Sequence, residues 1–179
     1  MVDSIAEVGF ARTTAAEITR RAGVTWGAVQ HHFGDKDGIL LAVLEDSFRR
    51  FAERLAAVPL DGVSIERRVR LFLESAWDHF TSREYASTYE ILLDHLRRSD
   101  LPGPGWREQM SLAWDREWRR FFDLAAIPRR RHGELQHYTL SVLSGLASMR
   151  LLEGRDARAR DAELALLART LVRELAPAG

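Results

Sequence analysis

Apolar residues recur every three or four positions along most of this chain, and nowhere do they alternate with polar residues for long enough to predict a strand. That spacing is typical of amphipathic α-helices, each of which buries one face. The pattern predicts about nine helices, of which three are short and lie at the front of the chain. We therefore expect an all-α protein whose longer helices form an antiparallel bundle.

Two short helices near the front are delimited by capping residues. Thr14, followed three residues later by Glu17, is a capping-box pattern, and Gly23 stands where a helix C-terminus favours positive φ. Thr25 is placed to cap a second helix, over 26–32. Two short helices joined by a tight glycine-containing turn have the geometry of a helix-turn-helix, but a plain helical hairpin has the same outline. The geometry alone leaves both interpretations open.

The longer helices follow behind Asp35, which is placed to cap the first of them, and Pro59 with Gly62 ends that helix. A further helix is predicted over residues 85–96, followed by the proline- and glycine-rich break at 101–105. The five predicted apolar stripes are Leu40, Leu44, Phe48 or Phe51 and Leu55; Ile65, Val69, Phe72, Ala76 and Phe80; Trp106, Met110, Trp114, Trp118 and Phe121; Leu135, Tyr138, Val142, Leu146 and Met149; and Leu164, Leu167, Leu171 and Leu175.

Composition narrows the function classes. The chain has no cysteine, which excludes disulfides, zinc–thiolate sites and cysteine nucleophiles. Its 26 Lys and Arg residues balance 26 Asp and Glu, which argues against a surface that coats nucleic acid all round but allows a local basic face. No apolar run approaches the roughly 18–20 residues that span a bilayer, and residues 1–10 lack a signal-peptide pattern. We expect a cytoplasmic protein with no membrane partner.

A more specific signal is a set of spaced residues spread over about 40 positions at the front of the chain. The set consists of Gly9-Phe10, Thr13-Thr14, Ile18, Ala22-Gly23-Val24-Thr25, Gly27, Val29, His32-Phe33, Lys36 and Leu40. It resembles the signature of the TetR family of bacterial transcriptional regulators; the rest of the chain is similar to that family only in the number and length of its helices. The resemblance implies a helix-turn-helix DNA-binding domain over 1–45 and a helical ligand-binding and dimerisation domain over 46–179. It also implies a repressor, not an enzyme and without a cofactor, that a small molecule releases from operator DNA.

The resemblance assigns the DNA contacts as well, and the residue types suit them, because hydroxyls, cations and helix N-termini attract phosphates. The positions that touch phosphate in the family are Thr14, Thr25, His31, His32 and Lys36, and those that face bases or the groove are Trp26, Gly27 and Gln30. Gln30 replaces the usual tyrosine and can pair with adenine through two hydrogen bonds, whereas Trp26 can pack on thymine methyl groups. His32 has a second interpretation, as an anchor of the turn against helix one.

The segment before Gly9 departs from the family, which has a longer helix one and a basic arm there. Residues 1–8 provide about two helical turns. We therefore expect a shortened helix one and a DNA-binding domain that is less stable than is typical.

Aromatic residues of the later helices are candidates for the wall of an apolar cavity that holds a drug-sized ligand. An ordinary aromatic core is the alternative for each of them. The candidate ligand-binding residues are Trp77, Phe80, Tyr89, Trp114 and Trp118, with His137 as a polar group that orients the ligand.

A catalytic alternative rests on Glu134 and His137, which have the helical spacing of a carboxylate-bridged di-metal site. Such a site needs a second motif of this kind and two further glutamates, and the neighbouring run of arginines at 129–131 would repel a cation. The sequence also has no phosphate-binding loop and no identifiable nucleophile–base pair. A helical di-metal enzyme is a remote alternative, and we expect no metal and no catalysis.

Dimerisation is predicted for the last two helices. The candidate interface residues are Ser141, Gly145, Ser148 and Met149 on the first helix and Leu164, Leu167 and Leu171 on the second. In the family these two helices pair with those of a second subunit, which suits a pseudo-palindromic operator; both helices can also close the core of their own protomer. The expected partners are double-stranded operator DNA, a small-molecule effector and a second copy of the chain. A ligand-binding dimer that has lost operator binding through its short helix one is the alternative function.

Overall fold

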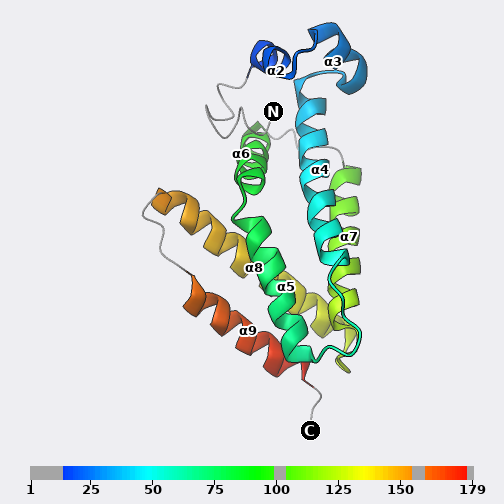
Figure 1. Cartoon of the computed structure of the whole chain (residues 1–179), viewed down its shortest axis with the longest axis vertical. Coiled ribbons are helices and arrows are strands. Elements are labelled where there is room, and N and C mark those ends of the chain that lie inside the picture. Colours follow the sequence, from blue (N-terminus) through cyan, green and yellow to red (C-terminus); the bar gives the residue numbers. More distant parts are fainter. Residues whose placement is uncertain (1–13, 99–103, 155–159, 177–179) are drawn as a thin grey trace. The chain divides into compact units, whose positions relative to one another are not determined.

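The computed structural model describes residues 14–98, 104–154 and 160–176, and every regular element in these ranges is a helix (Figure 1). The predicted all-α fold is thus confirmed, and none of the described helices is long and apolar enough to cross a membrane. The predicted short helix one falls in residues 1–13, outside these ranges. The helices are α2 (Ala15–Ala22), α3 (Trp26–Phe33), α4 (Lys36–Ala56), α5 (Ile65–Phe80), α6 (Arg83–Arg98), α7 (Pro104–Phe122), α8 (Arg129–Glu153) and α9 (Asp161–Leu175).

The chain divides into two compact units. The first contains Met1–Arg50 and Ser82–Met110, and the second contains Phe51–Thr81 and Ser111–Gly179. Helices α4 and α7 therefore contribute residues to both units. The domain boundary predicted between residues 45 and 46 falls inside α4 and stays a prediction.

The first unit has two small groups of buried apolar residues. Ile18 of α2, Val29 of α3 and Ile39 of α4 form one group, so the two short helices and the start of α4 share a core. Leu40 and Leu44 of α4 form the second with Ile91 of α6. Partly buried Leu41, Val43, Leu92 and Met110 pack around this second group.

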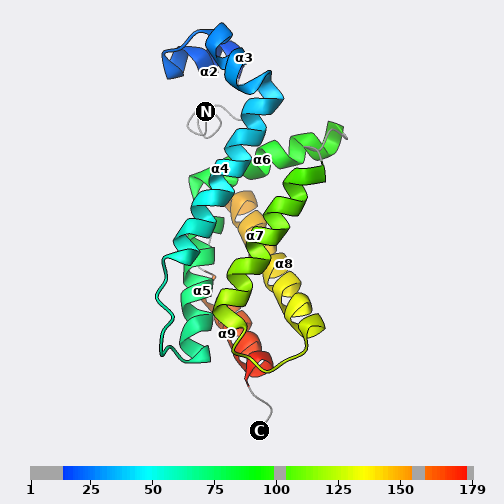
Figure 2. The same ribbon diagram turned by 90° about the vertical axis from the view of Figure 1, so that its right-hand side faces the viewer.

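The second unit is built around α5, which contacts both α8 and α9, while α8 and α9 also contact each other (Figures 1 and 2). The predicted stripe of α5 is buried at Val69, Phe72, Ala76 and Phe80. On α9 the predicted stripe is buried at Leu167, Leu171 and Leu175. Periodicity therefore identified the correct inner face of both helices.

The stripe predicted for α8 is buried at Leu135, half-buried at Val142 and Leu146, and exposed at Tyr138 and Met149. The buried residues of this helix are Leu135, Thr139, Leu143 and Ala147. Tyr138 and Met149, two members of the predicted stripe, are 43% and 50% exposed. Apolar residues occur on several sides of α8, so periodicity did not single out one face, and packing against α5 and α9 decided which side is buried.

Candidate DNA-binding helices and aromatic core

Residues 23–25 join α2 to α3, and polar caps begin both helices as predicted. The Thr14 hydroxyl accepts a hydrogen bond from the Glu17 N–H at 3.2 Å, and the Thr25 hydroxyl accepts one from the Ala28 N–H at 3.3 Å. Gly23 follows α2 with a φ of 66°, in the left-handed region that favours glycine. These contacts, together with the shared core, define a helix-turn-helix.

The last turn of α2 carries two arginines whose charge is locally balanced. The Glu17 carboxylate accepts hydrogen bonds from Arg20 at 2.7 and 3.0 Å and from Arg21 at 2.5 Å. These two arginines lower the pKa of Glu17 to about 2. The carboxylate therefore stays ionised and holds both cations on the surface of α2.

Helix α3 buries one residue, Val29, and leaves the rest of its length exposed. The side chain of Lys36 lies outside the described part of the structure. The other predicted DNA contacts, Thr14, Thr25, Trp26, Gly27, Gln30, His31 and His32, are all exposed. The structure thus leaves hydroxyl, amide, imidazole and indole groups of α3 and of the two caps available to a partner.

A glycine that sequence analysis did not single out shapes the start of α4. The Gly38 N–H donates to the Asp35 carboxylate at 2.8 Å, which confirms Asp35 as a cap. A Cβ added to Gly38 would lie 1.8 Å from the carbonyl oxygen of Phe33, at the end of α3. Only glycine fits this close approach, so Gly38 sets the spacing between α3 and α4.

A cluster of rings from α4, α5 and α7, which we call the aromatic core, lies within the second unit. Phe51 is stacked between His79 on one face and Trp114 on the other, with ring centroids 4.3 and 5.5 Å away. Phe72 lies 5.6 Å from Trp114 and 5.5 Å from Trp118. The remaining members are Phe80, Phe121 and Phe122. Seven carbon-rich rings and one imidazole thus meet in one place.

The two tryptophans of the aromatic core have indole N–H groups for which the core provides no hydrogen-bond acceptor. Trp114 and Trp118 are 7% and 1% exposed. Within the described ranges neither indole N–H has a hydrogen-bond acceptor. A buried indole N–H normally finds an acceptor, because an unmade hydrogen bond costs free energy in a dry environment.

His79 is a buried titratable group of the aromatic core. Burial lowers its pKa to about 4, and the nearby positive charge of Arg54 lowers it in the same direction. The Arg54 guanidinium lies 3.1 Å from His79 Nδ1, and since arginine is always a donor, this nitrogen accepts. His79 is therefore neutral at physiological pH, with its proton on Nε2.

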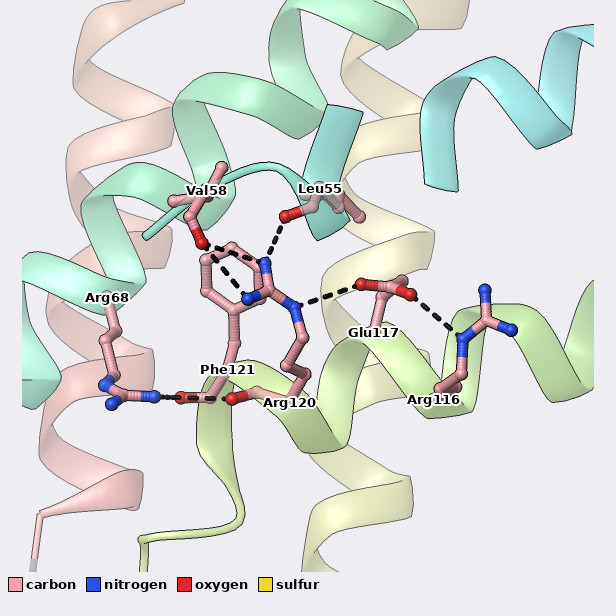
Figure 3. A network of polar contacts seen from close by, with 7 residues as sticks. All are labelled: Leu55, Val58, Arg68, Arg116, Glu117, Arg120 and Phe121. Carbon is pink, nitrogen blue, oxygen red and sulfur yellow. Dashed lines mark hydrogen bonds and ion pairs between the residues drawn. The ribbon is translucent and has the colours of Figure 1, made fainter. Parts of the chain in front are cut away.

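Arg120 joins α7 to the end of α4 (Figure 3). Its guanidinium donates to the carbonyl oxygens of Leu55 and Val58, and to the carboxylate of Glu117 at 3.3 Å. The Glu117 side chain is only 4% exposed, and its other oxygen accepts from Arg116 at 3.0 Å. A buried carboxylate thus orients an arginine that satisfies carbonyls at a helix C-terminus.

Arg68 of α5 makes a second set of such contacts. It donates to the carbonyl oxygens of Arg120 and Phe121 at 3.3 and 3.2 Å, as Figure 3 shows. It also donates to Leu60 at 2.6 Å and Val63 at 3.0 Å, in the loop that follows α4. The two arginines therefore tie this loop and the end of α4 to the end of α7.

The structure brings some predicted ligand-binding residues together and separates others. Trp114, Trp118 and Phe80 belong to the aromatic core, and Trp77 is half-buried on α5. Tyr89 belongs to the first unit, where it stacks on Tyr85 at 6.0 Å. His137 is exposed on α8. Phe51 and His79 were not predicted as part of the site. His79 could have been found from its position on the buried face of α5, one turn after Ala76 and two turns after Phe72.

The predicted dimer residues are more exposed on α8 than on α9. On α8, Ser141, Gly145 and Met149 are exposed and Ser148 is half-buried, with its hydroxyl donating to the Ser144 carbonyl at 2.8 Å. On α9, Leu167 and Leu171 are buried within the protomer, and Leu164 is half-buried.

The carboxylate of Glu134, which the di-metal alternative used as a metal ligand, accepts a hydrogen bond from Arg131 at 2.9 Å and forms an ion pair with Arg130.

A capped helix-turn-helix with an exposed second helix, joined to a helical unit, defines the class of helix-turn-helix DNA-binding regulators. Residues 2–43 match the model of a family described as bacterial regulatory proteins, tetR family. The HTH-type transcriptional regulator BetI of Cronobacter sakazakii is 31% identical over 162 residues, which span 86% of this chain and 77% of that relative. The chain therefore belongs to the TetR family and is a DNA-binding transcriptional regulator.

Two solved structures share the whole fold. SCO7518, a proposed transcriptional regulator from Streptomyces coelicolor A3(2), is 21% identical with a TM-score of 0.61, over 97% of this chain and 92% of that one. A proposed regulator from Saccharomonospora viridis, solved in complex with choline, is 19% identical with a TM-score of 0.55, over 96% and 89%. At these identities the likeness shows the fold alone.

Proposed function

We propose that the protein is a repressor that binds operator DNA through α2 and α3 and is released when a small apolar or aromatic molecule binds in the aromatic core. The observation that carries this proposal is the contrast between α3, which buries only Val29, and α7, which buries two tryptophans. Helix α3 therefore has exposed side chains that can contact DNA, whereas α7 contributes apolar side chains that can contact a ligand. The protein would act in the cytoplasm, where the chromosome lies.

The exposed groups of the helix-turn-helix divide into two roles. Thr14, Thr25, His31, His32 and Lys36 would contact phosphates, which position the protein without reading sequence. Trp26, Gly27 and Gln30 would lie against the bases, where Gln30 can recognise an adenine through its amide. Both cap hydroxyls already accept a backbone N–H, and each hydroxyl keeps its own proton to donate to a phosphate.

Release by a ligand requires that the ligand binds the DNA-incompetent arrangement more tightly than the competent one, because equal affinity for both shifts nothing. Phe51 belongs to the aromatic core and to α4, the helix that also provides Ile39 to the core of the helix-turn-helix. A molecule that displaces Phe51 would therefore act on a helix that both units share.

A homodimer is part of this proposal. Tyr138, Ser141, Gly145 and Met149 form an exposed line along α8, on a different side from the buried residues of that helix. A Cβ added to Gly145 would meet nothing within 4 Å, so a partner helix can approach closely there. An exposed apolar line with small residues at its centre suits a self-complementary interface.

A quaternary ammonium ion is the second candidate for the ligand class. It is favoured by the neighbouring regulator in complex with choline, and aromatic rings can hold such a cation over their faces. In this chain, however, Glu117 is the one buried carboxylate among the described residues, and it is already paired with Arg116 and Arg120. These charges therefore favour an uncharged or anionic ligand.

DNA binding is tested by titrating the DNA upstream of the protein's own gene at several salt concentrations. Lys36→Ala should weaken binding to all sequences and reduce the salt slope by about one unit. The matched control is Arg70→Ala, which removes an exposed cation from α5 and should change nothing. Gln30→Ala should cost about 1–3 kcal/mol, at one base pair only. A wild-type protein that fails to bind, or equal losses in Lys36→Ala and Arg70→Ala, would contradict the proposed DNA-binding face.

A further inference from the structure

Two indole N–H groups of the aromatic core are donors without an acceptor among the described residues. Trp114 and Trp118 stand four residues apart, so their side chains lie on the same face of α7. Both side chains are more than nine-tenths buried. Since the indole nitrogen can only donate, each of these groups needs an oxygen or another acceptor from outside the described chain.

The charges at the edge of the aromatic core complement an acceptor. The Arg54 guanidinium contacts the neutral His79, and the guanidinium carbon of Arg120 lies 5.0 Å from the ring centre of Phe121. The carboxylate of Glu117 shares each oxygen with an arginine. Arg54 is therefore a positive charge at this edge, and the negative charge of Glu117 is already neutralised, which favours oxygen lone pairs and opposes a cation.

We propose that the effector is a small apolar molecule with a hydrogen-bond-accepting oxygen, in a carbonyl or carboxylate group, that accepts from the indole N–H groups of Trp114 and Trp118. Its hydrocarbon part lies against Phe51 and Phe72. This inference rests on the proposed ligand binding in the aromatic core and specifies the chemistry of that ligand. The cationic end of a quaternary ammonium ion has no lone pair and leaves both donors unsatisfied.

Ring packing determines how such a ligand binds. Phe72 lies within 5.6 Å of both indoles, and Phe51 is stacked on Trp114, so the rings are in contact with one another. A molecule that reaches both N–H groups has to separate these rings. Small ligands with one ring are therefore expected, and a larger one would have to displace more of the core.

The proposal is tested with probes that differ only in the acceptor. Acetophenone is compared with ethylbenzene, and benzoate with toluene, by calorimetric titration of the full-length chain, with choline as the cationic probe. We expect each oxygen-bearing probe to bind about 10-fold more tightly than its hydrocarbon partner, and choline to bind more weakly than either of them. If the hydrocarbons or choline bind as tightly as the oxygen-bearing probes, the inference is overturned.

Two variants that keep an aromatic ring test the assigned donors. Trp114→Phe and Trp118→Phe remove the N–H and make the side chain smaller, so each should weaken acetophenone binding by about 3- to 10-fold relative to ethylbenzene binding in the same variant. The hydrocarbon serves as the control for folding and for cavity size in the same variant. If acetophenone and ethylbenzene lose affinity equally, the indoles act by packing alone and the inference is wrong.

Failure of this inference can be told apart from failure of the proposed function. Probes that bind in an oxygen-dependent manner but leave the DNA complex intact would contradict ligand release while supporting the assigned ligand chemistry. Release of DNA by choline or by the hydrocarbons, with no preference for an acceptor, would contradict the chemistry while supporting ligand release.

Discussion

Replacement of Arg120 by methionine removes a cation that serves three acceptors at once. The guanidinium donates to the carbonyl oxygens of Leu55 and Val58 and to the buried carboxylate of Glu117, and its carbon lies 5.0 Å from the ring centre of Phe121. Methionine retains most of the apolar volume and flexibility of the arginine side chain. The variant therefore isolates the polar contacts of Arg120.

The expected loss follows from the burial of the partners. Hydrogen bonds from a charged donor contribute about 1.5–3 kcal/mol each, but the Arg120 side chain is 32% exposed and water replaces part of what is lost. Glu117 keeps Arg116 as a partner, which limits the cost of its buried charge. We expect a loss of about 2–3 kcal/mol in the free energy of unfolding, or about 4–12 °C in Tm.

The assay is thermal and urea unfolding followed by circular dichroism, at one protein concentration because a dimer's stability depends on it. Arg116→Met is the matched control. It removes the other arginine of Glu117, whose side chain is 69% exposed, and should cost less than about 1 kcal/mol. Equal losses in the two variants would refute the argument that Arg120 acts through the carbonyls of Leu55 and Val58.

A double variant separates the two contributions of Arg120. If the loss came mainly from leaving the Glu117 carboxylate buried with one partner fewer, adding Glu117→Gln to Arg120→Met should recover much of it. If the loss came from the two carbonyls, as we expect, the second substitution should recover little.

Three further predictions follow from single residues. Gly38→Ala should lower the free energy of unfolding by about 1–3 kcal/mol and weaken DNA binding, because the added Cβ would clash with the carbonyl oxygen of Phe33. Gly133→Ala in α8 is the control: a Cβ there meets nothing within 4 Å, so this variant should be neutral or stabilising in the same unfolding assay. Between pH 6.5 and about 4 the unfolded chain protonates His79 and the folded protein does not, so stability should fall as the pH drops through this window. Relative to His79→Phe, wild type should lose up to about 3 kcal/mol across it, and parallel pH curves would contradict the neutral, buried imidazole. Gly145→Glu should convert a dimer to a folded monomer in size-exclusion chromatography with light scattering, and an unchanged mass would remove α8 from the proposed interface.

Helices α2 and α3 and their caps could be predicted almost residue by residue, because their signals are local. The hydroxyls of Thr14 and Thr25 each accept a hydrogen bond from the backbone N–H three residues later and so cap the helices that follow, and Gly23 ends α2 by its own backbone conformation. Each of these interactions closes within one helical turn. No distant part of the chain has to be known to predict them.

The buried face of a helix could be predicted where the apolar residues form a single stripe. It could not be predicted where apolar residues occur on all sides of the helix. Periodicity identified Phe72 and Ala76 on α5 and Leu171 on α9. On α8 it selected Tyr138 and Met149, and the structure buries Thr139 and Ala147 instead. The choice between neighbouring faces of α8 was made by α5 and α9, which are far away in the sequence.

By itself, then, the sequence determined the helices, their caps and the family to which the chain belongs, whereas partners across the core were decided only by tertiary structure. Periodicity places Trp114 on an inner face of α7, but the stacking of Phe51 between that indole and His79 depends on how three helices meet. Likewise, Arg120 reaches carbonyls 62 and 65 positions earlier in the chain. Charged residues such as Arg120 and Glu117 look like surface residues in a sequence, because the desolvation that makes them rare in a core is offset only by partners that the folded chain supplies.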